Sequence, residues 1–268
     1  MSMVTTHSVP GEPRLSVDAA GAGELVIFLH GIGGNKRNWH DNLPEFSRHF
    51  LAAALDIRGY GESDDYEGPM TDEALVDDID RVMDFFGAGK AHLVGLSMGS
   101  EIAPIYAQAR PDRVMSLTLC AAMTGSSAMT DEEKQDFVGS RKTPLLNGRE
   151  PRDIAGPVAR SLIGEKATQD VLSKLVDSMS RLRKASYIKA IEWDIDVDNR
   201  SIFPGIEVPV HIIAGSDDRL TPPSMGREVS KLTPGSVFSV VRDSGHLINI
   251  EKPLEFNELA ISFLKRHR

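Results

Sequence analysis

The chain has 268 residues, 41% of them hydrophobic, and a formal net charge of −9 at pH 7. This composition is typical of one folded domain with a sizeable core and excludes a disordered chain. The negative charge argues against a general nucleic-acid binder, which needs a basic face. No signal peptide and no apolar run near the roughly 20 residues of a membrane-spanning helix are found. We therefore expect a cytoplasmic protein that binds neither nucleic acid nor membrane.

The first third of the chain alternates predicted strands and helices. Apolar runs at Leu25–Leu29 and Phe50–Leu55 predict short buried strands. The first is followed by the glycine-rich stretch His30–Gly34 and the second by Asp56–Ser63. Apolar residues then recur at helical spacing over Thr71–Phe86, with a threonine as the expected N-cap. Strands that alternate with helices predict a mostly parallel sheet covered on both faces.

The stretch Gly95-Leu96-Ser97-Met98-Gly99 follows the apolar run Ala91–Val94 and precedes a helix-like segment over Ser100–Arg110. This strand, sharp turn and helix form the context in which G-x-S-x-G exposes a nucleophilic serine. The flanking glycines let strand and helix approach closely, and the first N–H groups of the helix face whatever the serine attacks. Ser97 is therefore the candidate nucleophile. A glycine-rich turn that merely contains a serine is the alternative for this motif alone.

After the predicted strand Val114–Leu119 the pattern changes. Residues 123–205 are nearly free of strand signals and rich in helix formers, which predicts a helical lid inserted between two strands. The lid contains 13 basic and 13 acidic residues, so the rest of the chain carries the whole net charge of −9. Relative to the body, the lid is then the favourable place for an anionic substrate group, although ordinary solvated helix faces also explain its charges.

Two further strands predict the partners that a serine nucleophile needs. Val210–Ala214 leads into Gly215-Ser216-Asp217-Asp218, and Val237–Val241 leads to His246. A serine requires an imidazole base, and the imidazole requires a carboxylate that fixes its tautomer. Both candidates follow the carboxyl ends of strands, where ligands bind in open α/β sheets. We take His246 as the base and Asp218 as the acid, with Asp217 as the alternative acid.

Together these motifs resemble those of the α/β-hydrolase fold family over nearly the whole chain. His30–Gly34 resembles the oxyanion loop of that family, Asp56–Ser63 its strand-4 signature, and Gly215-x-x-Asp218 and Gly245-His246 its acid and base motifs. The resemblance implies a mostly parallel, doubly wound sheet with an inserted helical lid. It divides the chain into a core of residues 1–122 and 206–268 and a lid of residues 123–205.

Within the family, two stretches resemble 3-oxoadipate enol-lactonases and their esterase relatives: Gly226-Arg227-Glu228 and His246–Glu251. The enol-lactonase interpretation adds a carboxylated substrate that a lid arginine binds. One departure is that Ser100-Glu101 follows the elbow, where the family usually has small residues. Whether Glu101 contacts the site stays open at this stage.

The resemblance implies a serine hydrolase that cleaves a carboxylic ester or lactone through an acyl-enzyme. Ser97 attacks the carbonyl carbon, and His246 takes its proton and later protonates the leaving oxygen. The backbone N–H groups of Ile32 and Met98 form the expected oxyanion hole. We expect a small-molecule ester or lactone as the partner and no cofactor or metal. The oligomeric state is not predicted.

Two tryptophans are candidates for the substrate pocket. Trp39 follows the oxyanion loop, and Trp193 lies near the end of the lid. Both could form the wall of an apolar pocket. Packing between lid and body explains them equally well.

Other activities compete with ester hydrolysis. A C–C bond hydrolase of ring-cleavage products uses a similar triad, but such enzymes commonly have an aromatic residue after the histidine, where this chain has Leu247. A ligand receptor, a cofactor-free oxygenase and a perhydrolase also remain as alternatives, because fold alone does not prove function. Haloalkane dehalogenases and epoxide hydrolases are disfavoured because they need an aspartate in place of Ser97.

Overall fold

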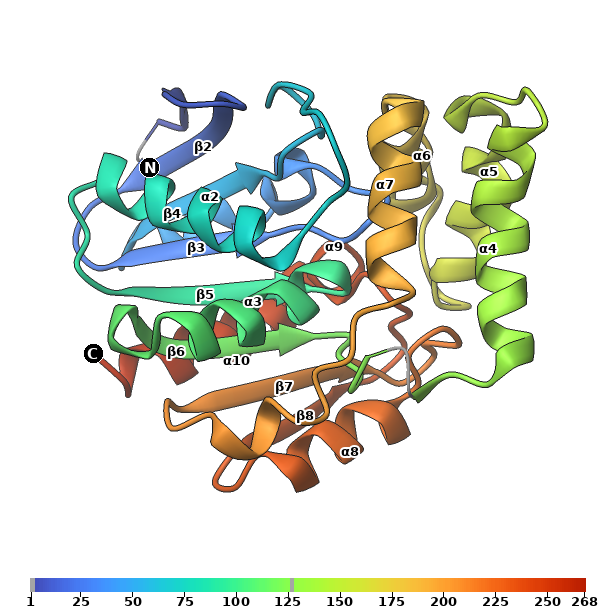
Figure 1. The fold of residues 1–268 in the computed structure, drawn as a ribbon. Coiled ribbons are helices and arrows are strands. Elements are labelled where there is room, and N and C mark those ends of the chain that lie inside the picture. Colours follow the sequence, from blue (N-terminus) through green and yellow to red (C-terminus); the bar gives the residue numbers. More distant parts are fainter. Residues whose placement is uncertain (1–2, 126–127) are drawn as a thin grey trace.

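The computed structural model describes residues 3–125 and 128–268. Its centre is one eight-stranded sheet in the order β1-β2-β4-β3-β5-β6-β7-β8 (Figure 1). The first two strands run antiparallel to their neighbours, whereas β4, β3 and the later strands are parallel. The strand bounds are β1 Thr5–Val9, β2 Leu15–Gly21, β3 Leu25–Leu29, β4 Leu51–Asp56, β5 Ala91–Leu96, β6 Val114–Cys120, β7 Val210–Gly215 and β8 Val237–Val241. The predicted mostly parallel sheet is confirmed.

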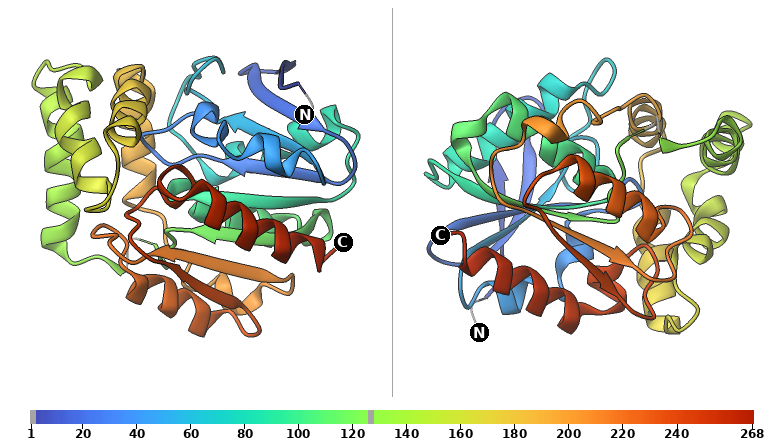
Figure 2. Two further views of the ribbon diagram at one scale, coloured as in Figure 1. Left: turned by 180° about the vertical axis from the view of Figure 1, so that it is seen from behind. Right: turned by 90° about the horizontal axis from the view of Figure 1, so that it is seen from below.

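Helices cover both faces of the sheet. Figure 1 and the reverse view in Figure 2 place α2 and α3 on one face and α1 and α10 on the other. The bounds of the helices outside the lid are α1 Leu43–Phe46, α2 Asp72–Phe85, α3 Met98–Ala109, α8 Pro223–Leu232, α9 Ile248–Glu251 and α10 Pro253–Lys265, with 3-10 turns η1 Lys36–Trp39, η2 Pro111–Arg113 and η4 Phe203–Gly205. The predicted cap of α2 is present, because the Thr71 side chain accepts a hydrogen bond from the Ala74 N–H.

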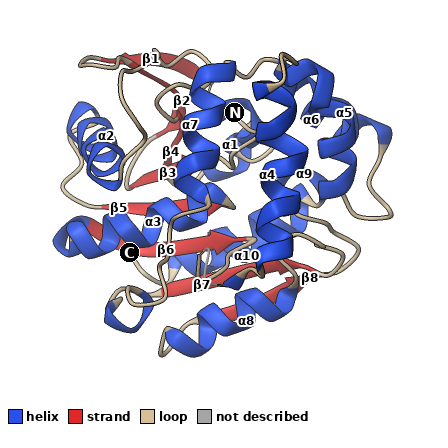
Figure 3. Cartoon of the chain, turned by 45° about the vertical axis from the view of Figure 1, so that its right-hand side comes forward, coloured by secondary structure: helices blue, strands red, loops and turns tan. Residues whose placement is uncertain are grey.

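The described residues of the segment predicted as a lid contain four α-helices between β6 and β7, namely α4 Asp131–Leu146, α5 Pro151–Leu162, α6 Gln169–Ser180 and α7 Lys184–Asp194. Figures 1 and 3 show them standing together beyond the carboxyl ends of the central strands. Of these helices α5 and α6 are amphipathic, and all four contain buried residues. They lie at the edge of the sheet at which open α/β folds bind ligands.

Strands β1 and β2 were not among the predicted elements. β1 is a half-exposed edge strand of mixed polarity, so it lacks a clear alternating pattern. β2 is buried although it contains Ser16 and Asp18. Buried Lys36 lies 2.6 Å from Glu62 and 3.4 Å from both Asp18 and Asp56, which makes these polar positions compatible with burial.

No helix among the described residues has the length and apolar character needed to cross a membrane.

Candidate active site

Ser97 is the single residue between the end of β5 and the first residue of α3. Its φ of 54° and ψ of −121° are a backbone conformation that few residues adopt. The strained turn is held from both sides. The Ser97 N–H donates to the Cys120 carbonyl at 2.9 Å, and the Ser100 hydroxyl donates to the Ser97 carbonyl at 2.7 Å. Such strain persists at functional sites when the surroundings fix the backbone.

The flanking glycines explain how the turn fits. A Cβ atom on Gly95 would lie 2.1 Å from the Gly99 carbonyl oxygen, and one on Gly99 would lie 2.2 Å from the Leu29 carbonyl oxygen. Any larger residue at either position would push α3 away from the sheet. The G-x-S-x-G spacing is therefore a packing requirement of this turn.

The structure brings Asp218 and His246 into contact. Nδ1 of His246 lies 2.8 Å from Oδ2 of the Asp218 carboxylate, and both side chains are buried. The Thr221 hydroxyl donates to the same oxygen at 2.7 Å. Burial alone would raise the pKa of Asp218, but the charge and hydrogen bond of His246 and the bonds from Thr221 hold it below its ordinary value. Asp218 is thus an ionised carboxylate that orients the imidazole.

Asp217, the alternative acid, points elsewhere. Its carboxylate accepts a hydrogen bond from the Ser216 hydroxyl at 2.7 Å, and the structure gives it no contact with His246. The two neighbouring aspartates are separated because the turn after β7 directs one side chain inward and the other outward.

The loop that carries His246 is tied to the lid. The His246 N–H donates to the Leu162 carbonyl at 2.8 Å, and one carboxylate oxygen of Glu251 accepts from the N–H groups of Gly164 and Gly245 at 2.9 and 3.0 Å. The sequence did not reveal this role for Glu251. The base is therefore held between α9 and the end of α5, so its position depends on both the body and the lid.

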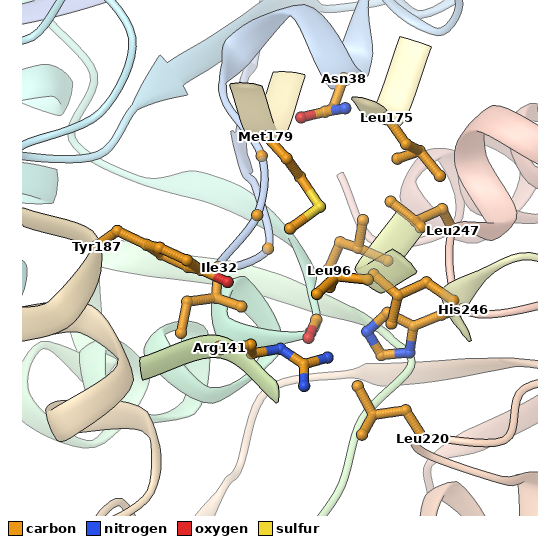
Figure 4. Close-up of a pocket in the computed structure, with 16 residues that line it drawn as sticks. Ile32, Asn38, Leu96, Arg141, Leu175, Met179, Tyr187, Leu220, His246 and Leu247 are labelled. Atoms are coloured by element: carbon orange, nitrogen blue, oxygen red, sulfur yellow. The ribbon is translucent and has the colours of Figure 1, made fainter. Parts of the chain in front are cut away.

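Ser97 and His246 line one cavity, which Figure 4 shows in close-up. The wall opposite them comes from the lid and is mostly apolar, and the polar exceptions are Arg141 and Tyr187. The lining residues contributed by the lid are Arg141, Val158, Leu162, Leu175, Met179 and Tyr187. A water-poor cavity of this kind strengthens any electrostatic interaction with a bound substrate.

The predicted oxyanion residues border this site. Met98 begins α3, so its N–H has no partner within the helix. Ile32 lines the cavity, and its carbonyl accepts a hydrogen bond from the Tyr60 hydroxyl at 3.0 Å, which fixes the orientation of the peptide after Ile32. His30 lies beneath this loop, with Nδ1 2.9 Å from the Gly31 carbonyl and Nε2 accepting from the Ile57 N–H at 3.2 Å. Burial lowers the pKa of His30, so a neutral imidazole braces the loop.

Arg141 is a site residue that the sequence analysis did not single out. It is 5% exposed, and its guanidinium lies over the Phe137 ring at 4.1 Å and donates to the Ser140 hydroxyl at 2.9 Å. Among the described residues it forms no ion pair with a carboxylate. Burial lowers the pKa of Arg141, while Tyr187 and Asp194 oppose that effect, and an arginine stays charged under such conditions.

A signal for Arg141 was present in the sequence. The buried residues of α4 are Phe137, Arg141 and Leu145, which recur every four positions. An arginine four residues after one buried apolar residue and four before another shares their face of the helix, so its charge is directed at the interior. A buried cation without a carboxylate partner is costly and therefore suggests a ligand that supplies one.

The two tryptophans require a correction, because neither is among the residues that line the cavities beside Ser97. Trp39 is fully buried and packs against Phe28 and Phe256 in the core. Trp193 donates its indole N–H to Asp72 at 2.7 Å, which joins the lid to the start of α2. Both are packing residues. A single sequence cannot tell an aromatic side chain in a pocket wall from one in the core.

Comparisons with known proteins agree with this architecture. A solved structure of a thermophilic esterase from Thermogutta terrifontis, with malate bound, is similar at a TM-score of 0.86 and 25% identity, covering 99% of this chain and 100% of that one. The enol-lactonase from Burkholderia xenovorans is similar at a TM-score of 0.83 and 25% identity, covering 97% and 100%. A 2-hydroxy-6-oxononadienedioate/2-hydroxy-6-oxononatrienedioate hydrolase from Burkholderia vietnamiensis is 27% identical over 95% of this chain and 92% of its own length.

Other curated relatives are longer than this chain. It spans 64% of the length of the acetyltransferase components of acetoin cleaving systems from Cupriavidus necator and Pseudomonas putida. The family model described as alpha/beta hydrolase fold matches residues 24–253. This match covers most of the sheet, the elbow, the lid and both loops that carry Asp218 and His246. The chain therefore belongs to the alpha/beta hydrolase fold family.

Proposed function

We propose that this protein is a serine hydrolase that cleaves a carboxylic ester or lactone through an acyl-enzyme. The observation that carries the proposal is that His246, hydrogen-bonded to Asp218 at 2.8 Å, lines the same cavity as Ser97 in its strained turn. Because Asp218 accepts the proton on Nδ1, Nε2 of His246 is the free base. A similar esterase and a similar enol-lactonase support the assignment.

The reaction follows from these positions. His246 takes the hydroxyl proton of Ser97 as the oxygen attacks the carbonyl carbon, and the Asp218 carboxylate stabilises the imidazolium that forms. The developing oxyanion accepts hydrogen bonds from the N–H groups of Met98 and Ile32, each worth about 100- to 1000-fold in rate. His246 then protonates the leaving oxygen, and water hydrolyses the acyl-enzyme by the same route.

The buried arginine extends the proposal to the substrate. An ester or lactone that carries a carboxylate would place it against Arg141, which lines the cavity with Ser97 and His246 and has no carboxylate partner of its own among the described residues. A guanidinium binds a carboxylate bidentately, and the interaction is stronger where water is excluded. The similar esterase structure contains malate, a dicarboxylate, which is consistent with an anionic ligand.

The test is hydrolysis by pH-stat across short esters, long esters, anionic esters and lactones, including 3-oxoadipate enol-lactone, with Ser97→Ala alongside. We expect turnover that disappears in the variant, with anionic members preferred. Wild-type protein that is folded but inactive on the whole panel contradicts the proposal. Loss of colour from a ring-fission dienoate would then assign C–C bond hydrolysis instead.

A further inference from the structure

A second cavity also reaches Ser97, and two of its lining residues are buried acids. Glu101 comes from the first turn of α3 and is 2% exposed, while Asp194 ends the lid helix α7 and is 7% exposed. The cavity also includes Ser100 and Thr221, and the rest of its wall is mostly apolar. The sequence analysis identified Glu101 as a departure from the family pattern without assigning it a role.

The Glu101 carboxyl is hydrogen-bonded to the neighbouring acid Asp194 but receives no other hydrogen bond. Among the described residues no amide, hydroxyl or cationic group donates to either of its oxygens. Asn199 donates to the Glu101 backbone carbonyl at 2.8 Å, which anchors the main chain but leaves the side chain unsatisfied. A buried polar group that lacks hydrogen-bond donors destabilises the fold, so a retained example needs an explanation. A ligand group in the cavity would supply the missing hydrogen bonds.

The charge of the pair indicates which ligand group fits. Burial and the neighbouring Asp194 raise the pKa of Glu101 well above its ordinary value. Burial raises the pKa of Asp194 to about 6, although Glu101, Arg141 and His246 oppose that effect. Near neutral pH the pair therefore holds one proton and one negative charge. Arg141 forms no ion pair with it, but the charge of Arg141 helps to stabilise the ionised form of Asp194.

A hydroxyl group matches this pair. The one proton of the pair lies in the hydrogen bond between the two acids, and the carboxyl oxygens that remain can accept a hydrogen bond from a hydroxyl. An apolar group would leave these oxygens unsatisfied, and a second carboxylate would be repelled by the charge already present.

The position of His246 indicates which end of the substrate enters the second cavity. His246 lines the first cavity but is not among the residues that line the second. The leaving oxygen has to receive its proton from His246. The leaving group therefore extends along the first cavity, and the acyl group, attached to Ser97, extends into the second.

We propose that the cavity lined by Glu101 and Asp194 binds the acyl group of the substrate and recognises a hydroxyl on it. This inference rests on the proposed hydrolase function and extends it to a substrate class, the esters or lactones of hydroxylated acids. Both acids act as binding residues that position the acyl chain. Neither takes part in the proton transfers at Ser97.

The experiment compares kcat/KM for methyl hexanoate with that for its 3-hydroxy and 6-hydroxy derivatives. We expect wild type to prefer at least one hydroxylated ester by about tenfold, the effect of one hydrogen bond to a buried group. Glu101→Leu should abolish that ratio, and Glu101→Gln, which can still donate and accept, should restore part of it. If Glu101→Leu does not fold, Glu101→Met takes its place.

A matched control comes from α7, the lid helix that ends at Asp194. Glu192 lies outside the cavity, with 50% of its side chain exposed and an ion pair to Lys142, so Glu192→Gln removes a nearby carboxylate without entering the site. Its preference ratio should equal that of wild type. A ratio lowered as much by Glu192→Gln as by Glu101→Leu overturns the proposal.

Three results separate this inference from the function on which it rests. Wild type that cleaves all three methyl esters equally overturns the hydroxyl subsite but supports the hydrolase. A preference for 4-hydroxybutyl acetate over butyl acetate, without one on the acyl side, overturns the acyl assignment. Wild type that cleaves no ester contradicts the proposed function. Calorimetry with 3-hydroxyhexanoate, 6-hydroxyhexanoate and hexanoate then tests the subsite alone, and equal affinities for wild type and Glu101→Leu would overturn it.

Discussion

Oδ2 of Asp218 accepts two hydrogen bonds in a buried position, from Nδ1 of His246 at 2.8 Å and from the Thr221 hydroxyl at 2.7 Å. The other carboxylate oxygen accepts from the N–H groups of Leu220 and Thr221 at 2.9 and 3.0 Å. Four donors thus fix one carboxylate at the end of β7. This arrangement selects the tautomer of His246 that leaves Nε2 available toward the cavity.

Asp218→Asn should lower kcat about 10⁴-fold with the fold intact, because an amide cannot stabilise the imidazolium and favours the wrong tautomer. Asp217→Asn is the matched control, since its carboxylate contacts Ser216 and not the imidazole. We expect that control to stay within about twofold of wild type, as surface substitutions usually do. Ester hydrolysis with both purified variants checks this. Equal losses would mean that the acid has been misassigned.

Thr221→Val should raise the pKa of Asp218 by removing a hydroxyl that stabilises its ionised form. Because the folded-state pKa of Asp218 is held below its ordinary value, its ionised form is lost only as the pH falls through that lowered value. Carbon-13 NMR of labelled aspartate should therefore show the Asp218 carboxyl titrating at a higher pH in the variant than in wild type. Thr221→Ser keeps the donor and should retain the wild-type titration. The same titration in all three proteins would argue against the role of Thr221.

Arg141→Met should raise KM for 4-acetoxybutanoate, whose carboxylate is on the leaving group, by about tenfold or more, because it removes a buried charged hydrogen bond to the substrate carboxylate. KM for the neutral ester butyl acetate should change far less. Arg141→Lys keeps the charge but not the planar guanidinium, so its KM for the anionic ester should lie between those of wild type and Arg141→Met. Initial rates with both esters measure this difference. A similar rise in KM for the two esters would show that Arg141 shapes the cavity and does not bind an anion.

Gly99→Ala should destabilise the protein by about 3 kcal/mol, because the added methyl overpacks the interface between α3 and β3. Its Cβ would meet the Leu29 carbonyl oxygen at 2.2 Å. Gly89→Ala is the control, since a Cβ there has nothing within 4 Å. Urea unfolding of the two variants beside wild type gives the free energies. If Gly99→Ala loses no more free energy of unfolding than the control, the turn around Ser97 can accommodate a methyl group, contrary to what its geometry indicates.

Glu101→Gln should stabilise the protein increasingly as the pH rises above 4.5, the ordinary pKa of this carboxyl. In the unfolded chain Glu101 ionises near that value, whereas burial keeps it protonated in the fold. Wild type therefore loses stability from that pH up to the raised pKa, and the amide does not. Thermal melts should show a gain of at least about 3 °C at pH 8, since 1 kcal/mol moves Tm by about 2–4 °C at this size. Glu192→Gln should show no such pH-dependent gain.

Much of this protein was predictable from the sequence because its signals are local. The elbow at Ser97 needs glycines two residues to either side, and the close contacts of Gly95 and Gly99 show why. The apolar runs of the parallel strands and the helical period that begins after Thr71 reflect burial of neighbouring residues along the chain. The hydrolase fold, its mostly parallel sheet and the helical character of the lid segment follow from such patterns.

Other features depend on residues that meet only in the folded chain. In the sequence only the spacing from Gly215 favoured Asp218 over Asp217, since the direction of each side chain is set by the turn after β7. The packing roles of Trp39 and Trp193 were likewise undecided, because a core and a pocket wall require the same apolar surface. β1 and β2 were missed because the edge position and the buried ion cluster around Lys36 permit polar residues there.

The sequence by itself determined the fold, the candidate nucleophile and the candidate base, because each is encoded by neighbours within about ten residues. Only the tertiary structure decided what surrounds Ser97. It directs Arg141 of the lid into the first cavity and joins Glu101 of the core to Asp194 of the lid in the second. These pairings span large separations along the chain, and their chemistry comes from burial and mutual charge, which no local pattern records.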